Sequence, residues 1–189
     1  MPRLVTEFVT FSTTEAYIKD PVATFAPIGE IMHMFHGFIS LYHGVDHDDK
    51  STGYAFAQWG SIEDHVAFTR SPEFVEQQAA FKDAQIIPTK VTHVKVSGQS
   101  LVDALSARVT EIGMLVLKAG NTEAQAAPHI DALCAVPTPA TAKVWGSTVE
   151  NPSEIVLLIG WPSYEVGGLY CFIIRSIGAL TCGDRATPS

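Results

Sequence analysis

Four histidines and three aspartates lie within residues 33–49, in the stretch HMFHGFISLYHGVDHDD. Imidazole and carboxylate groups can bind a metal ion or transfer protons. One shared metal site is not favoured, because HGFISLYH alternates like a strand, which places His36 and His43 on opposite faces. The aspartates around His47 lack both the ligand spacing and the turning glycine of an EF-hand loop. We therefore expect a solvated turn after this strand and no metal site.

Four polar residues are candidates for acid–base catalysis in a pocket. Two of them share a face of the strand just described, a third lies on the next strand, and the fourth lies on the first turn of the helix that follows. Histidine and tyrosine side chains placed in this way can exchange protons with a bound substrate. For each residue the alternative is a role in the core or at an interface. The candidate catalytic residues are His36, Tyr42, Tyr54 and His65.

The candidate substrate-binding residues are three aromatic side chains near these groups and one carboxylate inside an apolar strand. With the catalytic candidates they would form a partly polar cavity for a flat aromatic or polyketide-like ligand. They are Glu7, Phe38, Phe56 and Trp59. Glu7 has a counterpart, Glu111, in a second apolar strand. A carboxylate in an apolar cavity has a raised pKa and can act as an acid or base, whereas one at a strand end is hydrogen-bonded or solvated.

The composition is typical of a globular protein with a large core. Of the 189 residues 47% are hydrophobic and 17% are charged, and the net charge of −8 argues against a nucleic-acid partner. Three cysteines without a C-x-x-C pair indicate neither a disulfide framework nor a zinc site. The opening residues MPRLVTEFVTF lack the apolar region of a signal peptide, and the apolar residues 167–180 are too few to span a membrane. We expect a cytoplasmic protein that binds neither nucleic acid nor membranes.

Hydrophobic periodicity predicts the order strand, helix, two strands, helix, strand in the first half of the chain. This order is the split βαβ arrangement of ferredoxin-like folds. Asp20 marks the start of the first helix, and Ser61 with Asp64 marks the start of the second, which we expect to bend at Pro72. His93 alternates with its neighbours in the last strand and is expected to be exposed. The expected elements are residues 4–12, 20–35, 36–45, 53–60, 61–83 and 89–97.

The same order then begins again, which indicates an internal duplication. The triplet V-T-E occurs at Val5 and at Val109, an offset of 104 residues, and a W-x-S-x-E segment begins at Trp59 and at Trp161, an offset of 102 residues. The second copy ends differently, because no clear final strand follows Trp161. We expect a first unit at residues 1–98, a linker at residues 99–107 and a second unit with an altered C-terminal end at residues 108–189.

The segment WGSIEDHVAFTRSPEF, residues 59–74, resembles the strand-to-helix segment of the dimeric α+β barrel superfamily. That superfamily includes the antibiotic-biosynthesis monooxygenases, the stress-responsive A/B-barrel proteins and related polyketide cyclases. The resemblance implies an α+β fold in which two tandem ferredoxin-like (βαββαβ) units pack sheet to sheet as a barrel. It also implies a small-molecule pocket between a sheet and its own helices. Many members need no metal or organic cofactor, and others bind haem.

One residue departs from the pattern of the related cyclases. These often carry a catalytic histidine two residues after the proline of the second helix, and here that position is Phe74. The resemblance favours a cofactor-independent enzyme of secondary metabolism, of the monooxygenase, cyclase or decarboxylase type, acting on an aromatic or polyketide-like substrate. The alternatives are a non-catalytic barrel protein with a ligand-binding, stress or assembly role, and a haem-binding barrel enzyme. We predict no cofactor and no metal, and pairing as a homodimer is compatible with such a fold.

Overall fold

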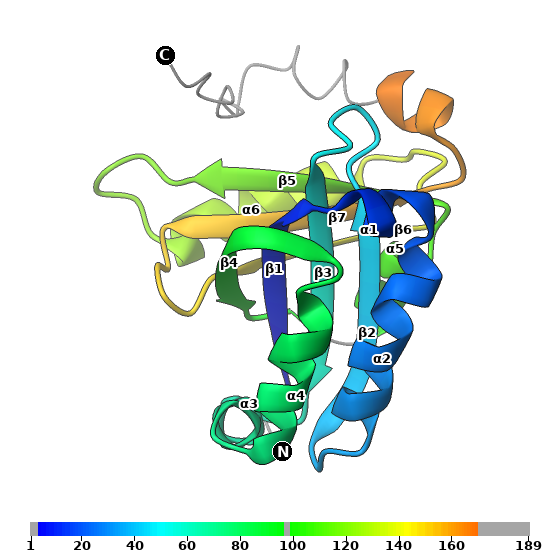
Figure 1. Cartoon of the computed structure of the whole chain (residues 1–189). Coiled ribbons are helices and arrows are strands. Elements are labelled where there is room, and N and C mark those ends of the chain that lie inside the picture. The colour runs from blue at the N-terminus through cyan, green and yellow to red at the C-terminus, as the bar shows by residue number, and fades with distance from the viewer. Residues whose placement is uncertain (1–3, 97–98, 170–189) are drawn as a thin grey trace. The chain divides into compact units, whose positions relative to one another are not determined.

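The computed structural model describes residues 4–96 and 99–169 of the chain (Figure 1). The chain divides into two compact units between His93 and Val94. The last strand of the first repeat, β4 (Gln85–Val94), ends at Val94, so the division lies just before its final residue. Val94 forms a β-bridge with Thr148 inside the second unit. Among the described residues, no helix combines the length and the apolar character that crossing a membrane requires.

The first unit has the predicted ferredoxin-like order. Its four strands form one sheet in the order β2-β3-β1-β4, and β1 and β2 both pair antiparallel with β3. The helices α2 and α4 lie against one face of this sheet (Figure 1). The elements are β1 (Val5–Thr13), α1 (Glu15–Lys19), α2 (Pro21–His33), β2 (Phe38–Val45), β3 (Thr52–Trp59), α3 (Ile62–Thr69), α4 (Pro72–Phe81) and β4 (Gln85–Val94).

Side-chain caps set the helix boundaries in the first unit. The Asp20 carboxylate accepts a hydrogen bond from the third residue of α2, and the Ser61 hydroxyl does the same for α3, as predicted from the sequence. The expectation of one long helix bent at Pro72 is wrong. The helix α3 ends at Thr69, and α4 begins at Pro72. Ser71 caps α4, and Pro72 occupies the first turn of α4, where a missing N–H is tolerated.

The two faces of the first sheet carry different side chains. The core cluster between sheet and helices contains Val5, Val9, Ala55, Ala57 and Trp59 from the strands, packed with residues of α2, α3 and α4. The opposite face of β1 and β3 carries aromatic rings, among which Phe8 and Phe56 stack with their centroids 4.7 Å apart. Because side chains alternate along a strand, a residue on one face cannot reach a site on the other.

The second unit repeats the first with one strand fewer among its described residues. Its sheet has the order β5-β7-β6. The elements are α5 (Gln99–Leu105), β5 (Val109–Val116), α6 (Glu123–Ala135), β6 (Ala142–Ser147) and β7 (Glu154–Trp161). The segment expected as a linker contains α5, whose Leu101 and Ala104 are fully buried. The expected altered end of this unit lies mostly in residues 170–189, outside the described residues, as does most of the apolar segment 167–180.

The strand register confirms the internal duplication. Val5 lies opposite Trp59 in the first unit, and Val109 lies opposite Trp161 in the second. The sequence motifs that suggested the repeat therefore occupy the same positions in two antiparallel strand pairs. The residues of β1 and β3 therefore have structural counterparts in β5 and β7.

Candidate active site

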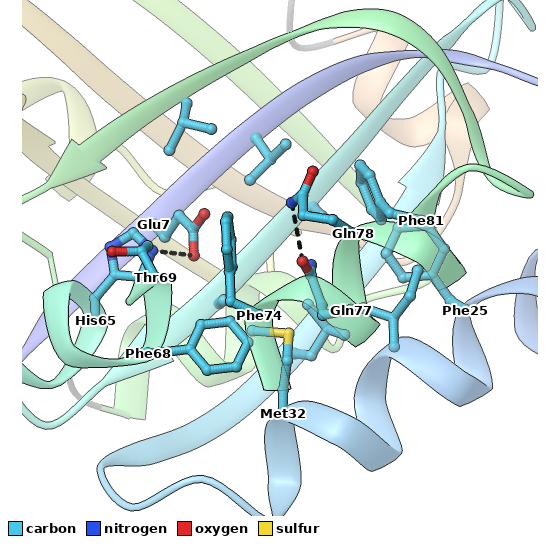
Figure 2. Close-up of a pocket in the computed structure, with 16 residues that line it drawn as sticks. Glu7, Phe25, Met32, His65, Phe68, Thr69, Phe74, Gln77, Gln78 and Phe81 are labelled. Atoms are coloured by element: carbon cyan, nitrogen blue, oxygen red, sulfur yellow. Dashed lines mark hydrogen bonds and ion pairs between the residues drawn. The ribbon is translucent and has the colours of Figure 1, made fainter. Parts of the chain in front are cut away.

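The first unit contains a cavity of about 310 Å³ between its sheet and its helices. Figure 2 shows Glu7 and His65 at one end of this pocket and Phe25 and Phe81 at the other. The apolar walls include Phe25, Ile28, Met32, Phe68, Phe74 and Phe81, and the polar lining groups are Glu7, His65, Thr69, Gln77 and Gln78. This size and character suit a small, mostly apolar ligand.

Helical spacing brings the helix residues of the pocket together. On α4, Phe74, Gln77, Gln78 and Phe81 have the i, i+3, i+4, i+7 spacing that places residues on one face. On α2, Phe25, Ile28 and Met32 follow the same rule. This spacing is visible in the sequence and could have identified these residues, which our sequence analysis did not select.

Two alanines of β3 make room for the cavity. Ala55 and Ala57 face the helices and line the pocket, where a larger side chain would project into it. Their counterparts in the second unit are Leu157 and Ile159, which are 6% and 2% exposed and belong to the core of that unit. The second sheet therefore fills the space that the first sheet leaves open.

Glu7 is the one carboxylate among the lining residues. It lies in the middle of β1, and its side chain is 13% exposed. The Trp59 indole donates a hydrogen bond to Glu7 Oε2 at 3.2 Å, and His65 Nε2 lies 3.4 Å from the same oxygen. Both contacts use Oε2, and the described residues provide no hydrogen bond to the second oxygen, Oε1, which leaves it open to a ligand.

His65 connects Glu7 to a second histidine. The His65 ring is 8% exposed and lies on the first turn of α3, and its Nδ1 is 2.7 Å from Nε2 of His93 on β4. One of these two nitrogens must donate the proton of this hydrogen bond. The expectation that His93 is exposed is wrong, because its ring packs at 4.8 Å from the His65 ring. No sequence pattern links two histidines on different elements, so this partner could not be predicted.

Burial decides the protonation of this pair. Removal from water raises the pKa of Glu7, although the hydrogen bond from Trp59 and the nearby His93 partly counteract the effect. Burial, with a smaller contribution from His93, lowers the pKa of His65 to about 4. His65 is therefore neutral at pH 7, and its 3.4 Å contact with Glu7 is not an ion pair with a charged imidazole.

The structure brings three of the eight predicted site residues together at the pocket. Glu7 and His65 line it, and Trp59 holds the carboxyl group of Glu7. Phe38 lies next to this group and packs edge-on against Trp59, with centroids 5.5 Å apart. Phe38 reaches the helix-covered face because the pairing of β2 with β3 shifts by one residue between Phe38 and Ser40.

The other four predicted residues lie away from the pocket. His36 precedes β2 instead of belonging to it, and its side chain is 97% exposed, so strand alternation does not apply to it. Tyr42 pairs with Phe56 in the register of β2 and β3, and both face away from the helices, as Tyr54 does. The Tyr54 hydroxyl donates to Asp46 Oδ2 at 3.1 Å. The structure thus does not bring His36, Tyr42 or Tyr54 into contact with His65.

The acidic hairpin uses its carboxylates to hold its own turn. Asp46 Oδ1 accepts hydrogen bonds from the backbone amides of Asp48 and Asp49, both at 2.9 Å. Asp49 in turn accepts bonds from Ser51 and Thr52. Among the described residues, no group of three histidine, cysteine, aspartate or glutamate side chains could hold a metal ion.

The second unit keeps the carboxylate–tryptophan pair without the histidine. The Trp161 indole donates to Glu111 Oε2 at 2.9 Å, as Trp59 does to Glu7. The counterpart of His65 is Gly167, where a side-chain carbon would lie only 3.0 Å from the Trp161 ring. A side chain at this position would therefore require Trp161 or the backbone of Gly167 to shift by a few tenths of an ångström.

Comparison with known proteins gives structural similarity alone. No family model matches the sequence, and no curated protein does. A "putative monooxygenase" from Fusobacterium nucleatum is 10% identical, with 94% of this chain and 88% of that chain covered and a TM-score of 0.65. An "anthrone oxidase-like protein" is 18% identical, with 96% and 88% covered and a TM-score of 0.63. The "putative monooxygenase" of Lactobacillus acidophilus is 13% identical, with 95% and 90% covered and a TM-score of 0.60.

The chain has the tandem α+β fold of these monooxygenase-like proteins. This likeness extends over nearly the whole of both chains. The resemblance to the antibiotic-biosynthesis monooxygenase group that residues 59–74 suggested is thereby confirmed for the fold.

Proposed function

We propose that the first unit is a small-molecule oxygenase that binds a flat aromatic substrate and removes a proton from it. The observation that carries this proposal is the carboxyl group of Glu7, nearly buried at one end of an apolar pocket and 3.4 Å from the imidazole of His65. Paired groups of this kind, with pKa values shifted by burial, are a common feature of sites for acid–base catalysis. The monooxygenase names of the similar structures agree with this reaction class.

The chemistry requires a substrate with an acidic C–H or O–H bond. Glu7 Oε1 accepts the proton, and the aromatic system of the substrate spreads the negative charge that remains. Such an electron-rich anion can transfer electrons to molecular oxygen without a redox group on the protein. The carboxyl group touches the reacting bond, so Glu7 is the catalytic residue, and the phenylalanine walls exclude water from the anion.

Anthrone is a suitable model substrate. It is flat, uncharged and aromatic, which suits the phenylalanine side chains that line the pocket. The name of one similar structure also refers to its oxidation. Its central CH₂ group is acidified by the ketone across the ring. Reaction with one O₂ breaks both C–H bonds and the O–O bond, converts the CH₂ group into a second ketone and releases the other oxygen as water.

A non-catalytic barrel protein with a stress or assembly role is the main alternative. That hypothesis predicts a filled cavity with its polar groups bonded to the backbone, whereas Glu7 and His65 bond to side chains at the edge of an open cavity. A haem enzyme is not favoured either. His65 is the one imidazole among the described lining residues, and both of its nitrogens are already in contact with Glu7 and His93.

The test is to measure oxidation of anthrone by the purified full chain. Oxygen uptake and the absorbance of anthraquinone both report the rate. Anthrone also oxidises slowly in buffer, so the rate without protein is the reference. We expect an acceleration with one O₂ consumed per anthrone. Tight binding of anthrone without acceleration would support a non-catalytic ligand-binding role instead. No binding and no acceleration across anthrone, naphthols and other polycyclic phenols would contradict the proposal.

A further inference from the structure

Three titratable groups of the first unit form a continuous line that begins at the pocket. Glu7 Oε2 and His65 Nε2 are 3.4 Å apart, and His65 Nδ1 and His93 Nε2 are 2.7 Å apart. Glu7 and His65 are nearly buried, whereas His93 is partly exposed. The line therefore connects the pocket with a group that is closer to water.

The hydrogen-bond donors limit how protons can be arranged along this line. Trp59 can only donate, so Glu7 Oε2 accepts its bond. A neutral His65 carries one N–H, which leaves two patterns. In the first, Glu7 Oε2–H donates to His65 Nε2 and His65 Nδ1–H donates to His93 Nε2. In the second, His93 Nε2–H donates to His65 Nδ1 and His65 Nε2–H donates to Glu7 Oε2, with Glu7 either ionised or protonated on Oε1.

The surroundings favour the first pattern. It leaves no charge on either buried group, and every N–H or O–H of Glu7 and His65 has an acceptor. The second pattern either leaves an isolated charge in an apolar pocket or leaves the Oε1 hydroxyl without an acceptor among the described residues, and both are unfavourable. A hydroxyl oxygen at Oε2 can also accept the Trp59 bond while it donates to His65. The raised pKa of Glu7 and the lowered pKa of His65 agree with a pair that is neutral on both sides.

We infer that Glu7, His65 and His93 form a proton relay, in which His93 holds the proton that leaves the substrate. This inference rests on the proposed function only in that the proton originates from a bound substrate. The substrate C–H or O–H bond breaks as an O–H bond forms at Glu7 Oε1. The Oε2–H proton then moves to His65 Nε2, and the Nδ1–H proton moves to His93 Nε2.

The relay separates charge without ionising a buried side chain. After the transfer, the substrate is an anion, His93 is an imidazolium, and Glu7 and His65 are both still neutral. The reverse transfer returns the proton to the reduced oxygen once the anion has reacted with O₂, and it restores the starting hydrogen bonds. His65 and His93 thus assist Glu7 without touching the substrate.

The first test reads the histidine tautomers directly and needs no substrate. Two-bond proton–nitrogen NMR spectra of the ¹⁵N-labelled full chain at neutral pH distinguish Nδ1–H from Nε2–H, and the His65→Asn variant assigns the signals of His65. The relay predicts that His65 carries its proton on Nδ1. A proton on Nε2 would overturn the inference, because Glu7 could then not pass a proton to this nitrogen.

The second test is kinetic. In His93→Ala we expect kcat for anthrone to fall about 10- to 100-fold with little change in KM, since losing part of an acid–base system affects the transition state and not binding. Added imidazole should restore much of the rate. The control is His129→Ala, which removes an exposed histidine of α6 in the second unit.

The two proposals fail in different ways. Unchanged kcat in His93→Ala, in a wild type that oxidises anthrone, would overturn the relay and leave the proposed function intact. A wild type that does not accelerate oxidation would contradict the proposed function. The tautomer of His65 would then decide on its own whether the relay is built into the first unit.

Discussion

Glu7 and Glu111 show how much a single neighbour changes the chemistry of a residue. Both lie in corresponding strands, and both accept a hydrogen bond from the tryptophan that ends the adjacent strand. Only Glu7 has an imidazole against it and an open cavity beside it, since Gly167 replaces the histidine in the second unit. The glutamate–tryptophan pair is therefore common to both units, whereas the cavity and the adjacent imidazole are found in the first unit.

The lowered pKa of His65 predicts a pH-dependent stability. A histidine whose pKa is 6.5 when unfolded and about 4 when folded stabilises the fold fully above pH 6.5, and this contribution is lost as the pH falls toward 4. Burial also raises the pKa of Glu7, so the comparison is best made between Glu7→Gln and the double variant Glu7→Gln/His65→Gln. We expect the first to lose stability relative to the second over this interval in urea unfolding. Parallel pH curves for the two would contradict the buried, neutral state of His65.

At the scale of elements, β3 creates the pocket. The side chains of β3 that face the helices are Ala55, Ala57 and Trp59. The two alanines leave space for the cavity, and the Trp59 ring lies at the end of the strand. The second unit has Leu157, Ile159 and Trp161 at these positions. Two differences on one strand face, Leu157 in place of Ala55 and Ile159 in place of Ala57, thus distinguish the filled sheet from the open one.

Exchanging one residue between the two units tests this account. Ala57→Ile copies the second unit and should abolish binding of a neutral aromatic probe such as 2-naphthol, while the unfolding free energy falls by no more than about 1–3 kcal/mol. The matched change Ile159→Ala removes a side chain that is 2% exposed and should lower the unfolding free energy by about 2–5 kcal/mol. It should leave binding unchanged. Calorimetric titration and urea unfolding measure the two quantities, and retained binding in Ala57→Ile would refute the assigned pocket.

The sequence predicted the strands and helices better than the directions of their side chains. Period-two and period-3.6 patterns are strong over long elements, so the βαββαβ order was correct. Side-chain directions depend on where a strand begins and on its register. β2 begins at Phe38 and shifts register directly after it, so the predicted shared face of His36, Phe38 and Tyr42 does not exist. A one-residue shift of this kind leaves no trace in the hydrophobic pattern.

The candidate site was predictable only in part for a related reason. Glu7 stands out because a carboxylate interrupts an apolar strand, and His65 because it opens a helix beside that strand. Their contact with each other, and that of His65 with His93, depends on how α3 and β4 approach β1 in space. No local pattern in the sequence encodes that approach.

At the scale of the whole molecule, the two duplicated units differ in their interiors. The repeat of V-T-E and W-x-S-x-E, visible in the sequence, corresponds to the same strand pairing in both units. The first unit contains the pocket, the acid and the imidazole, whereas the second retains the acid–tryptophan pair in a filled core. Glu111 is therefore a matched control for substitutions of Glu7.

The most direct measurement compares anthrone oxidation by Glu7→Gln with oxidation by Glu111→Gln. Both changes turn a carboxyl group into an amide by replacing one oxygen with NH₂. Both leave a carbonyl that can accept the tryptophan N–H, so neither should disturb the fold. Our account predicts that Glu7→Gln lowers kcat at least about 100-fold, the usual contribution of a general base, while Glu111→Gln retains the rate of the wild type. Equal rates in the two variants would contradict the assignment of the reaction to the first unit.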